Sequence, residues 1–204
     1  TVERKVVDLS GTGVAVDEDP LEAQLIPGMI IPELKLVFPN RTSVTCKVQV
    51  IYSQCKEEEG PLHTGLALLD ITPEDHLVLL SELHQAEDQC SYVSKRVNME
   101  ALWRFFFESG FIYPRKYIHM QASREKIKKN YEKLYTGCPA FARHFIYQKD
   151  NAILGHLSMF RFYSKSWLIQ HHASSLEGNH NAGIAVLNQA GSFTHDARRF
   201  EGMN

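Results

Sequence analysis

A short polar segment near the start of the chain, Asp-Leu-Ser-Gly-Thr-Gly at residues 8–13, lies between two apolar runs. The runs are Val6-Val7 before it and Val14-Ala15-Val16 after it. Glycine and serine between two extended apolar runs are typical of a tight turn that joins two strands. Such a turn gathers backbone N–H groups, a hydroxyl and a carboxylate at one edge of a sheet. The segment therefore predicts a nucleotide-binding turn, and a hairpin turn without any ligand is the alternative.

The rest of the first ninety residues predicts a sheet followed by one helix. Five residues, Val44, Cys46, Val48, Val50 and Tyr52, alternate with mostly polar positions, which is the pattern of a half-buried strand. Further strands are expected at Leu34 to Phe38 and at Thr64 to Ile71. Thr72-Pro73-Glu74-Asp75 then predicts a helix start, with Thr72 as the cap and Pro73 in the first helical position.

Asp8, Ser10 and Gly13 match the Asp-x-Ser-x-x-Gly signature of PilZ domains, the bacterial receptors for cyclic di-GMP. The strands that follow keep the order of that family, so residues 4–90 resemble a PilZ domain. The resemblance implies a small β-barrel with a C-terminal helix, in which the Asp/Ser turn contacts a guanine base and a phosphate of cyclic di-GMP. This chemistry is reasonable, because a carboxylate suits the N–H edge of guanine and turn N–H groups suit phosphate oxygens.

The second signature of that family, Arg-x-x-x-Arg in a segment before the first strand, has no counterpart in this sequence. Those arginines stack on and pair with the ligand, a role that lysine does not replace well. We therefore expect this chain to bind cyclic di-GMP weakly. The chain also begins inside an expected strand without an initiator Met, so we expect a fragment of a longer protein.

From Asn98 the composition changes, and a second α/β domain is expected at 98–204, after a first domain at 1–90 and a linker at 91–97. Helices are expected at Met99 to Ser109 and Arg124 to Tyr135. Three antiparallel strands are expected after them, at Arg143 to Gln148, Ile153 to Tyr163 and Trp167 to Ser174, and a third helix is expected from Ile184. The fold class expected for the whole chain is α+β.

This order of elements resembles the first part of a GNAT-type acyltransferase. The loop His180-Asn181-Ala182-Gly183-Ile184-Ala185 is similar to the pyrophosphate-binding loop of that family. The resemblance implies that His180, Gly183 and Ala185 hold acyl-CoA at a helix N-terminus. The chain ends at Asn204, soon after the third helix, so we expect an incomplete domain that would act as an acyl-CoA N-acyltransferase only in a longer parent chain.

His171 and His172 are adjacent in an expected strand and so should face opposite sides of the sheet. The alternation places Trp167, Ile169 and Ala173 on the face of His171. In the acyltransferase interpretation, His171 or His172 could serve as a base toward an amine. The alternatives are histidines with a structural role and, without a recognised spacing, a metal site that includes His180.

The composition bounds the remaining choices. The net charge of −2 gives no global attraction to duplex nucleic acid or an anionic membrane, and no apolar run is long enough to span a bilayer. Four cysteines without a Cys-x-x-Cys pair predict reduced thiols in a cytoplasmic protein. The aromatic residues 103–107 predict a helix core, and the basic residues of 124–133 predict a solvated helix face.

Two functional hypotheses follow from the sequence. The first is a cytoplasmic bacterial signalling protein, in which a PilZ-like domain binds a cyclic dinucleotide and is joined to an acyltransferase-like domain. The second is a non-enzymatic interaction module that has degenerate ligand sites and binds a protein partner.

Overall fold

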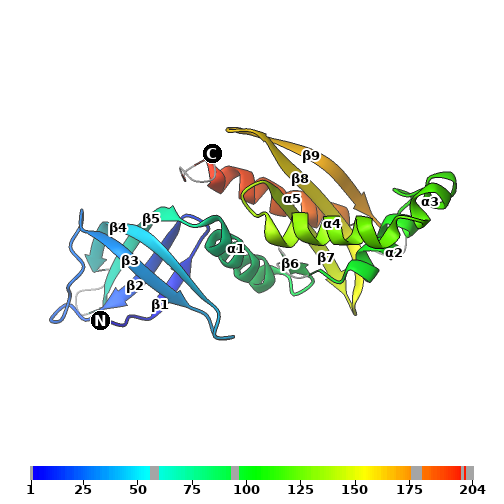
Figure 1. The fold of residues 1–204 in the computed structure, drawn as a ribbon. Helices are drawn as coiled ribbons and strands as arrows, with labels where there is room; N and C mark the ends of the chain where they lie inside the picture. The colour runs from blue at the N-terminus through cyan, green and yellow to red at the C-terminus, as the bar shows by residue number, and fades with distance from the viewer. Residues whose placement is uncertain (1, 56–59, 93–96, 176–180, 199, 201–204) are drawn as a thin grey trace. The chain divides into compact units, whose positions relative to one another are not determined.

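The computed structural model describes residues 2–55, 60–92, 97–175, 181–198 and 200. The chain is an α+β protein with two antiparallel sheets, and it packs as two units (Figure 1). Unit 1 comprises Thr1–Leu79 with Asp196–Met203, and unit 2 comprises Leu80–His195 with Asn204. The division between the units thus falls inside the first helix, ahead of the linker expected at 91–97.

The sheet of unit 1 has five strands in the order β1-β2-β5-β4-β3, and each strand is antiparallel to its neighbours. The strands are β1 (Val6–Leu9), β2 (Gly13–Glu18), β3 (Ile30–Val37), β4 (Ser43–Cys55) and β5 (Leu62–Ile71). Among the described residues no strand pair joins β1 to β3, so the barrel closure remains a prediction. Helix α1 (Pro73–Glu87) begins where expected, and Thr72 Oγ1 accepts a hydrogen bond of 3.1 Å from the N–H of Asp75.

The sheet of unit 2 contains the expected meander of three strands, β7 (Ala142–Lys149), β8 (Ala152–Tyr163) and β9 (Ser166–Ser174). The short β6 (Ser91–Tyr92), from the expected linker, pairs with β7. Four helices lie partly or wholly in this unit besides the end of α1: α2 (Met99–Glu108), α3 (Pro114–Gln121), α4 (Arg124–Gly137) and α5 (Asn181–Ala197). The hairpin turn at Asp150 and Asn151 has φ angles of 49° and 64°, as a turn of type I′ requires.

The two faces of this sheet carry different helices. Phe106 of α2 lies 5.3 Å from the ring of His156 on β8, and Tyr135 of α4 stacks 4.6 Å from His144 on β7. Phe193 of α5 lies 6.0 Å from Phe145, whose side chain points to the opposite face from that of His144. Helices α2 and α4 therefore cover one face and α5 covers the other.

The face predicted for His171 is wrong, because β9 contains a bulge. Opposite the adjacent residues Ser158 and Met159 of β8 stand His171 and Ile169, so Gln170 is the extra residue. As a result the ring centroid of Trp167 lies 5.1 Å from that of Phe193 on α5, whereas the ring centroid of His171 lies 4.8 Å from that of Phe106 on α2. Trp167 and His171 thus face opposite sides of the sheet.

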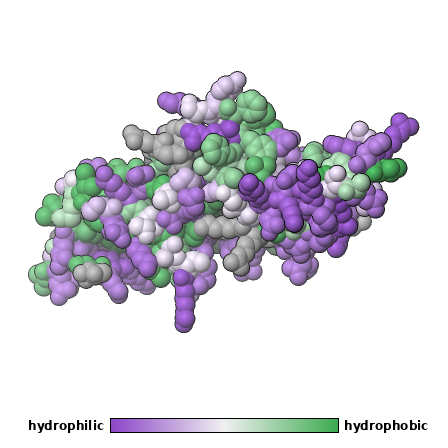
Figure 2. Space-filling view, in the orientation of Figure 1, coloured by the Kyte–Doolittle hydropathy of each residue, from purple (hydrophilic) through white to green (hydrophobic). Residues whose placement is uncertain are grey.

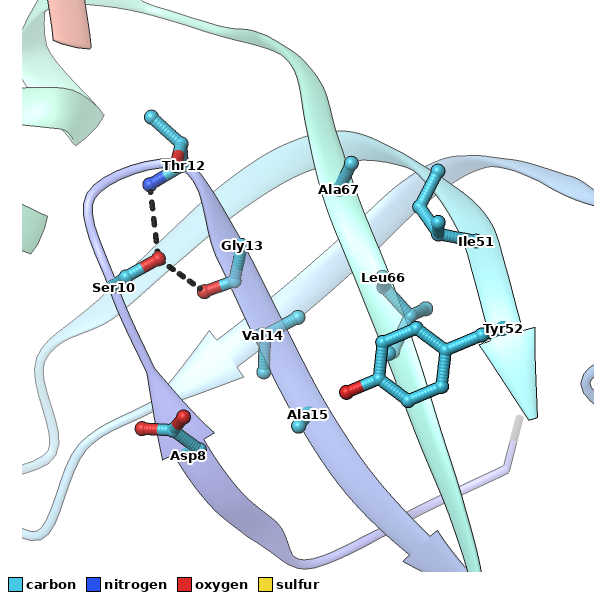
Figure 3. Close-up of a pocket in the computed structure, with 11 residues that line it drawn as sticks. Asp8, Ser10, Thr12, Gly13, Val14, Ala15, Ile51, Tyr52, Leu66 and Ala67 are labelled. Carbon is cyan, nitrogen blue, oxygen red and sulfur yellow. Dashed lines mark hydrogen bonds between the residues drawn. The ribbon is translucent and has the colours of Figure 1, made fainter. Parts of the chain in front are cut away.

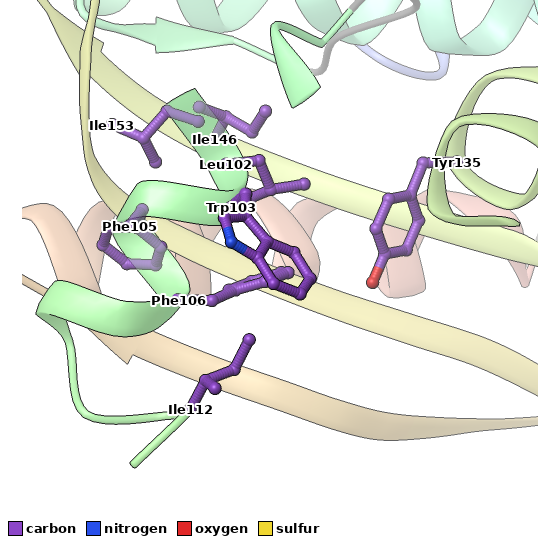
Figure 4. Close-up of a cluster of buried hydrophobic side chains, with 8 residues drawn as sticks. All are labelled: Leu102, Trp103, Phe105, Phe106, Ile112, Tyr135, Ile146 and Ile153. Atoms are coloured by element: carbon purple, nitrogen blue, oxygen red, sulfur yellow. The ribbon is translucent and has the colours of Figure 1, made fainter. Parts of the chain in front are cut away.

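The aromatic run of α2 forms a core, as predicted. Its buried cluster has eight members (Figure 4), which are Leu102, Trp103, Phe105, Phe106, Ile112, Tyr135, Ile146 and Ile153. Phe107 is the exception within the run, because 44% of its surface is exposed. Rings from α2 and α4 therefore make up half of this cluster, beside leucine and isoleucine side chains.

Hydrophilic residues gather over α4 on the face seen in Figure 2. Lys126, Lys129 and Lys133 are exposed, as expected for a solvated face. Lys128 is buried instead, and its ammonium group pairs with Glu100 and, at 2.8 Å, with Glu125. No helix in the described part of the chain is both long and apolar enough to cross a membrane.

Candidate functional site

The segment Asp8 to Gly13 forms the predicted turn between β1 and β2. The N–H of Ser10 donates to the carbonyl of Gly13 at 2.9 Å, and the Ser10 hydroxyl donates to the same oxygen at 3.3 Å. The N–H of Thr12 donates to Ser10 Oγ at 3.4 Å. Asp8 Oδ1 accepts from the N–H of Leu9 at 2.9 Å, while Oδ2 has no hydrogen-bond partner among the described residues. The turn thus holds its own hydroxyl in place and leaves one carboxylate oxygen available.

A row of four residues crosses the sheet from this turn. Asp8 pairs with Ala15, Ala15 pairs with Gly65, and Gly65 pairs with Tyr52. Residues directly opposite in antiparallel strands point to the same face of the sheet. A carboxylate and an aromatic ring therefore stand at the two ends of the row, with only a methyl group and a glycine between them.

Tyr52 reaches this face because of a bulge in β4. The pairing with β5 shifts between Val50 and Tyr52, so Ile51 is the extra residue. The alternation of the sequence predicts that Tyr52 shares the buried face of Val50, and this prediction is wrong. Val50 is 1% exposed, whereas Ile51 and Tyr52 are 53% and 39% exposed.

The ring of Tyr52 lies across Gly65, with its hydroxyl toward Ala15 (Figure 3). A Cβ at position 65 would stand 2.3 Å from Cε1 of the ring, so this arrangement requires glycine there. Gly13 is similarly constrained, because a Cβ would lie 3.0 Å from the carbonyl oxygen of Leu66. Small residues on β2 and β5 thus leave space for the ring and for whatever lies beside it.

We call this space the trough; it is a pocket of about 230 Å³ on the sheet of unit 1 (Figure 3). Its lining comes from four strands and the turn: Asp8, Ser10, Thr12, Gly13, Val14, Ala15, Ile51, Tyr52, Gly65, Leu66 and Ala67. The structure therefore brings all three residues predicted for nucleotide binding, Asp8, Ser10 and Gly13, into one pocket. Sequence reasoning missed the remaining walls, although Gly13-x-Ala15 and Gly65-x-Ala67 are spaced so that each pair shares a face.

The next row along the same face carries a hydrogen-bonded histidine and aspartate. Asp17 is the cross-strand partner of His63, and Asp17 Oδ1 lies 2.9 Å from His63 Nδ1. The ring of His63 lies 6.2 Å from the ring of Tyr52, centroid to centroid. A histidine oriented by a carboxylate thus stands beside the aromatic wall of the trough.

The two histidines predicted as catalytic are separated by the sheet. His171 is buried, and its Nδ1 lies 2.9 Å from Nδ1 of His156. Burial, with a smaller contribution from the neighbouring His172, lowers the pKa of His171 to about 4. His172 is exposed, and its Nε2 lies 2.9 Å from the carbonyl oxygen of Gly183. The imidazole of His171 is therefore held neutral under aromatic rings and away from solvent.

The residues predicted to bind CoA lie at or before the start of α5. His180 lies outside the described residues. Gly183 is buried against β9, where a Cβ would stand 3.3 Å from the Cβ of Ser174, and Ala185 is half-buried. The glycine at this position lets the helix approach the sheet, which is a packing role.

We expect Gly155→Ala to reduce the free energy of unfolding of unit 2 by about 1–3 kcal/mol, as other overpacked cores do. The added Cβ would stand 2.6 Å from the carbonyl oxygen of Ala182, and the backbone of α5 cannot rotate away as a side chain can. Gly137→Ala is the matched control, because a Cβ there meets nothing within 4 Å. Urea unfolding followed by tryptophan fluorescence would measure both variants, and equal stabilities would contradict the packing described for α5.

The described residues contain no group of three or more His, Cys, Asp or Glu side chains that could hold a metal ion. No family model matches the chain, and neither a curated protein nor a solved structure matches it.

Proposed function

We propose that unit 1 binds a guanine nucleotide in the trough, with cyclic di-GMP as its ligand, and that the chain belongs to a cytoplasmic bacterial signalling protein. The observation that carries this proposal is the row Asp8, Ala15, Gly65 and Tyr52. In this row the available carboxylate oxygen of Asp8 and the exposed ring of Tyr52 lie on either side of two small residues, so a planar base fits between them. The PilZ-like order of the strands supports cyclic di-GMP as the particular ligand.

The chemistry of a guanine base fits each wall of the trough. The base stacks on the ring of Tyr52, a contact that aromatic side chains make with bases at about 1–3 kcal/mol each. The carboxylate of Asp8 accepts hydrogen bonds from the N1–H and N2–H groups of guanine. Adenine lacks both groups, so the same carboxylate favours guanine over adenine.

The size of the trough limits how much of the ligand it can hold. Its volume of about 230 Å³ is below the range of roughly 300–1,000 Å³ typical of pockets for whole drug-sized ligands. We infer that one guanine of the dinucleotide occupies the trough and that the rest lies over the sheet. Since no lysine or arginine is among the described residues that line the trough, the affinity is expected to be weaker than low micromolar.

Tyr52→Ala is expected to weaken binding of cyclic di-GMP by roughly 5- to 160-fold, because it removes the stacking surface. Tyr52→Phe is the matched control and is expected to bind as the unmodified chain does. Titration calorimetry at neutral pH would measure both. Unchanged affinity in Tyr52→Ala would contradict the proposed site, and low-micromolar or tighter binding by the unmodified chain would contradict the expected weakness.

Asp8→Asn tests the choice of base separately from the stacking. The amide keeps the shape of the side chain but replaces one acceptor oxygen with a donor group. We expect the preference for cyclic di-GMP over cyclic di-AMP to shrink by about tenfold, from the loss of a charge-assisted hydrogen bond. An unchanged preference for cyclic di-GMP over cyclic di-AMP would show that Asp8 does not recognise the base.

We propose that unit 2 is the domain that responds when unit 1 binds its nucleotide. Its resemblance to GNAT-type acyltransferases implies that it binds acyl-CoA. The neutral, buried His171 and the engaged Nε2 of His172 give this activity less support than the trough gives to nucleotide binding. A non-enzymatic interaction module is the alternative for the whole chain. Thermal-shift measurements with cyclic di-GMP and with CoA distinguish these outcomes, since a module without ligands responds to neither.

A further inference from the structure

We propose that His63 is a proton-controlled phosphate contact at the end of the trough, so that affinity for a phosphate-bearing nucleotide rises as the pH falls from 8 to 6. This inference rests on the proposed function of the trough. It concerns a residue outside the Asp8–Gly13 turn, and it supplies the cationic group that the lining of the trough lacks.

The position of His63 follows from the register of the sheet. His63 lies two positions before Gly65 along β5, so both point to the face that carries the trough. Its ring centroid lies 6.2 Å from that of Tyr52. A base stacked on Tyr52 therefore has His63 within reach of its sugar-phosphate.

Asp17 fixes the orientation of this imidazole. With Asp17 Oδ1 2.9 Å from Nδ1, the proton of a neutral His63 resides on Nδ1, which donates a hydrogen bond to the carboxylate. Nε2 then carries a lone pair, and it makes no hydrogen bond with the described residues. A lone pair at this position repels a phosphate oxygen.

Protonation reverses the character of that atom. The imidazolium donates from both nitrogens, so Nε2 becomes a charged donor toward phosphate while Nδ1 keeps its bond to Asp17. Imidazole side chains change charge between about pH 5 and 8, which is the range in which this change would act. Protonation of His63 would therefore make the affinity for a phosphate-bearing nucleotide depend on pH, through the change of Nε2 from an acceptor to a donor.

The other groups around His63 do not supply a competing charge change in this range. The described titratable side chains facing it are Asp17 on β2 and Tyr52 on β4, and Gln54 on β4 is its neutral cross-strand partner. Asp17 and the more distant Asp8 are carboxylates, whose negative charge opposes that of a phosphate.

The test compares two ligands at pH 6.0 and pH 8.0 by titration calorimetry. Cyclic di-GMP carries phosphates, whereas guanosine offers the same base without them, and the base does not titrate in this interval. We expect cyclic di-GMP to bind about three- to tenfold more tightly at pH 6.0, as for a charge-assisted hydrogen bond, and guanosine to bind equally at both values. Circular dichroism at both pH values checks that the fold is unchanged.

Two variants of His63 complete the test. His63→Gln removes the charge, so cyclic di-GMP should bind at pH 6.0 as weakly as the unmodified chain binds it at pH 8.0. His63→Lys fixes the charge, so cyclic di-GMP should bind at both pH values as it binds to the unmodified chain at pH 6.0. A pH dependence that survives in His63→Gln, or that guanosine shares, overturns the role of His63. The absence of binding by either ligand at either pH overturns the proposed function itself.

Discussion

Truncation of Phe106 to alanine is expected to lower the free energy of unfolding of unit 2 by about 3–5 kcal/mol, the usual range for a buried phenylalanine. The side chain is 1% exposed and packs against four rings from outside α2, those of Phe111, Tyr131, His156 and His171. These neighbours come from α4, two strands and the segment after α2. Because they belong to different elements, the cavity cannot close by a shift of one of them.

The neighbouring Phe107 offers a matched control on the same helix. It is 44% exposed and contacts Tyr117 at 5.0 Å. We expect Phe107→Ala to cost about 1 kcal/mol or less. Both tryptophans of the chain, Trp103 and Trp167, belong to unit 2, so their fluorescence during urea unfolding reports on this unit. Equal losses in the two variants would contradict the core assigned to α2.

Acidification from pH 6.5 to pH 4 is expected to remove about 2–3 kcal/mol of the stability of unit 2 through His171, and His156 adds to the loss in the same direction. Burial lowers the pKa of His171 to about 4 and that of His156 well below its usual value. The unfolded chain has ordinary histidines that take up protons near pH 6.5, and the folded chain does not take them up until lower pH. The stabilisation is therefore complete above pH 6.5, is lost as the pH falls, and levels off below the folded pKa values.

The two imidazoles are expected to act as a pair, because their Nδ1 atoms lie 2.9 Å apart and share one hydrogen bond. The double variant His156→Leu/His171→Leu removes both imidazoles together, so neither is left buried without the hydrogen bond that the other supplied. We expect it to lose less than half as much stability as the unmodified chain between pH 7.0 and pH 4.5. His119→Gln, at an exposed histidine of α3, should retain the full loss. An acid loss of equal size in the double variant would assign the effect to other groups.

The strands and most of the helices could be predicted from the sequence because their patterns are local. The alternation along β4, the Thr72-Pro73 start of α1 and the turn at Asp150 each depend on a few adjacent residues. Helix α3 is not predicted by the sequence, because none of its residues is fully buried and only Tyr117 and Met120 pack against the core, which is too short an apolar pattern to recognise in the sequence. Barrel closure and the two family resemblances stay predictions.

The turn half of the candidate site could be predicted, whereas its aromatic half could not. Asp8, Ser10 and Gly13 are close in sequence, and turn chemistry identifies them. Tyr52 faces the trough because of an extra residue in β4, and strict alternation assigns it to the core. The same error occurs at His171, where an extra residue in β9 reverses the face. The alternation of apolar and polar residues within one strand does not reveal a bulge, since a bulge is defined by the register against the partner strand.

The extra residue at Ile51 means that the trough depends on the register of β4 against β5 as well as on the identity of its walls. With Ile51 present, loss of the bulge would turn the ring of Tyr52 toward the interior and leave Gly65 uncovered, with every lining residue of the turn unchanged. Deletion of Ile51 would instead place Tyr52 directly after Val50, where alternation alone points the ring over Gly65. Among related sequences, a tyrosine two positions after the residue aligned with Val50 would therefore need the bulge to form the aromatic wall, whereas a tyrosine directly after it would not.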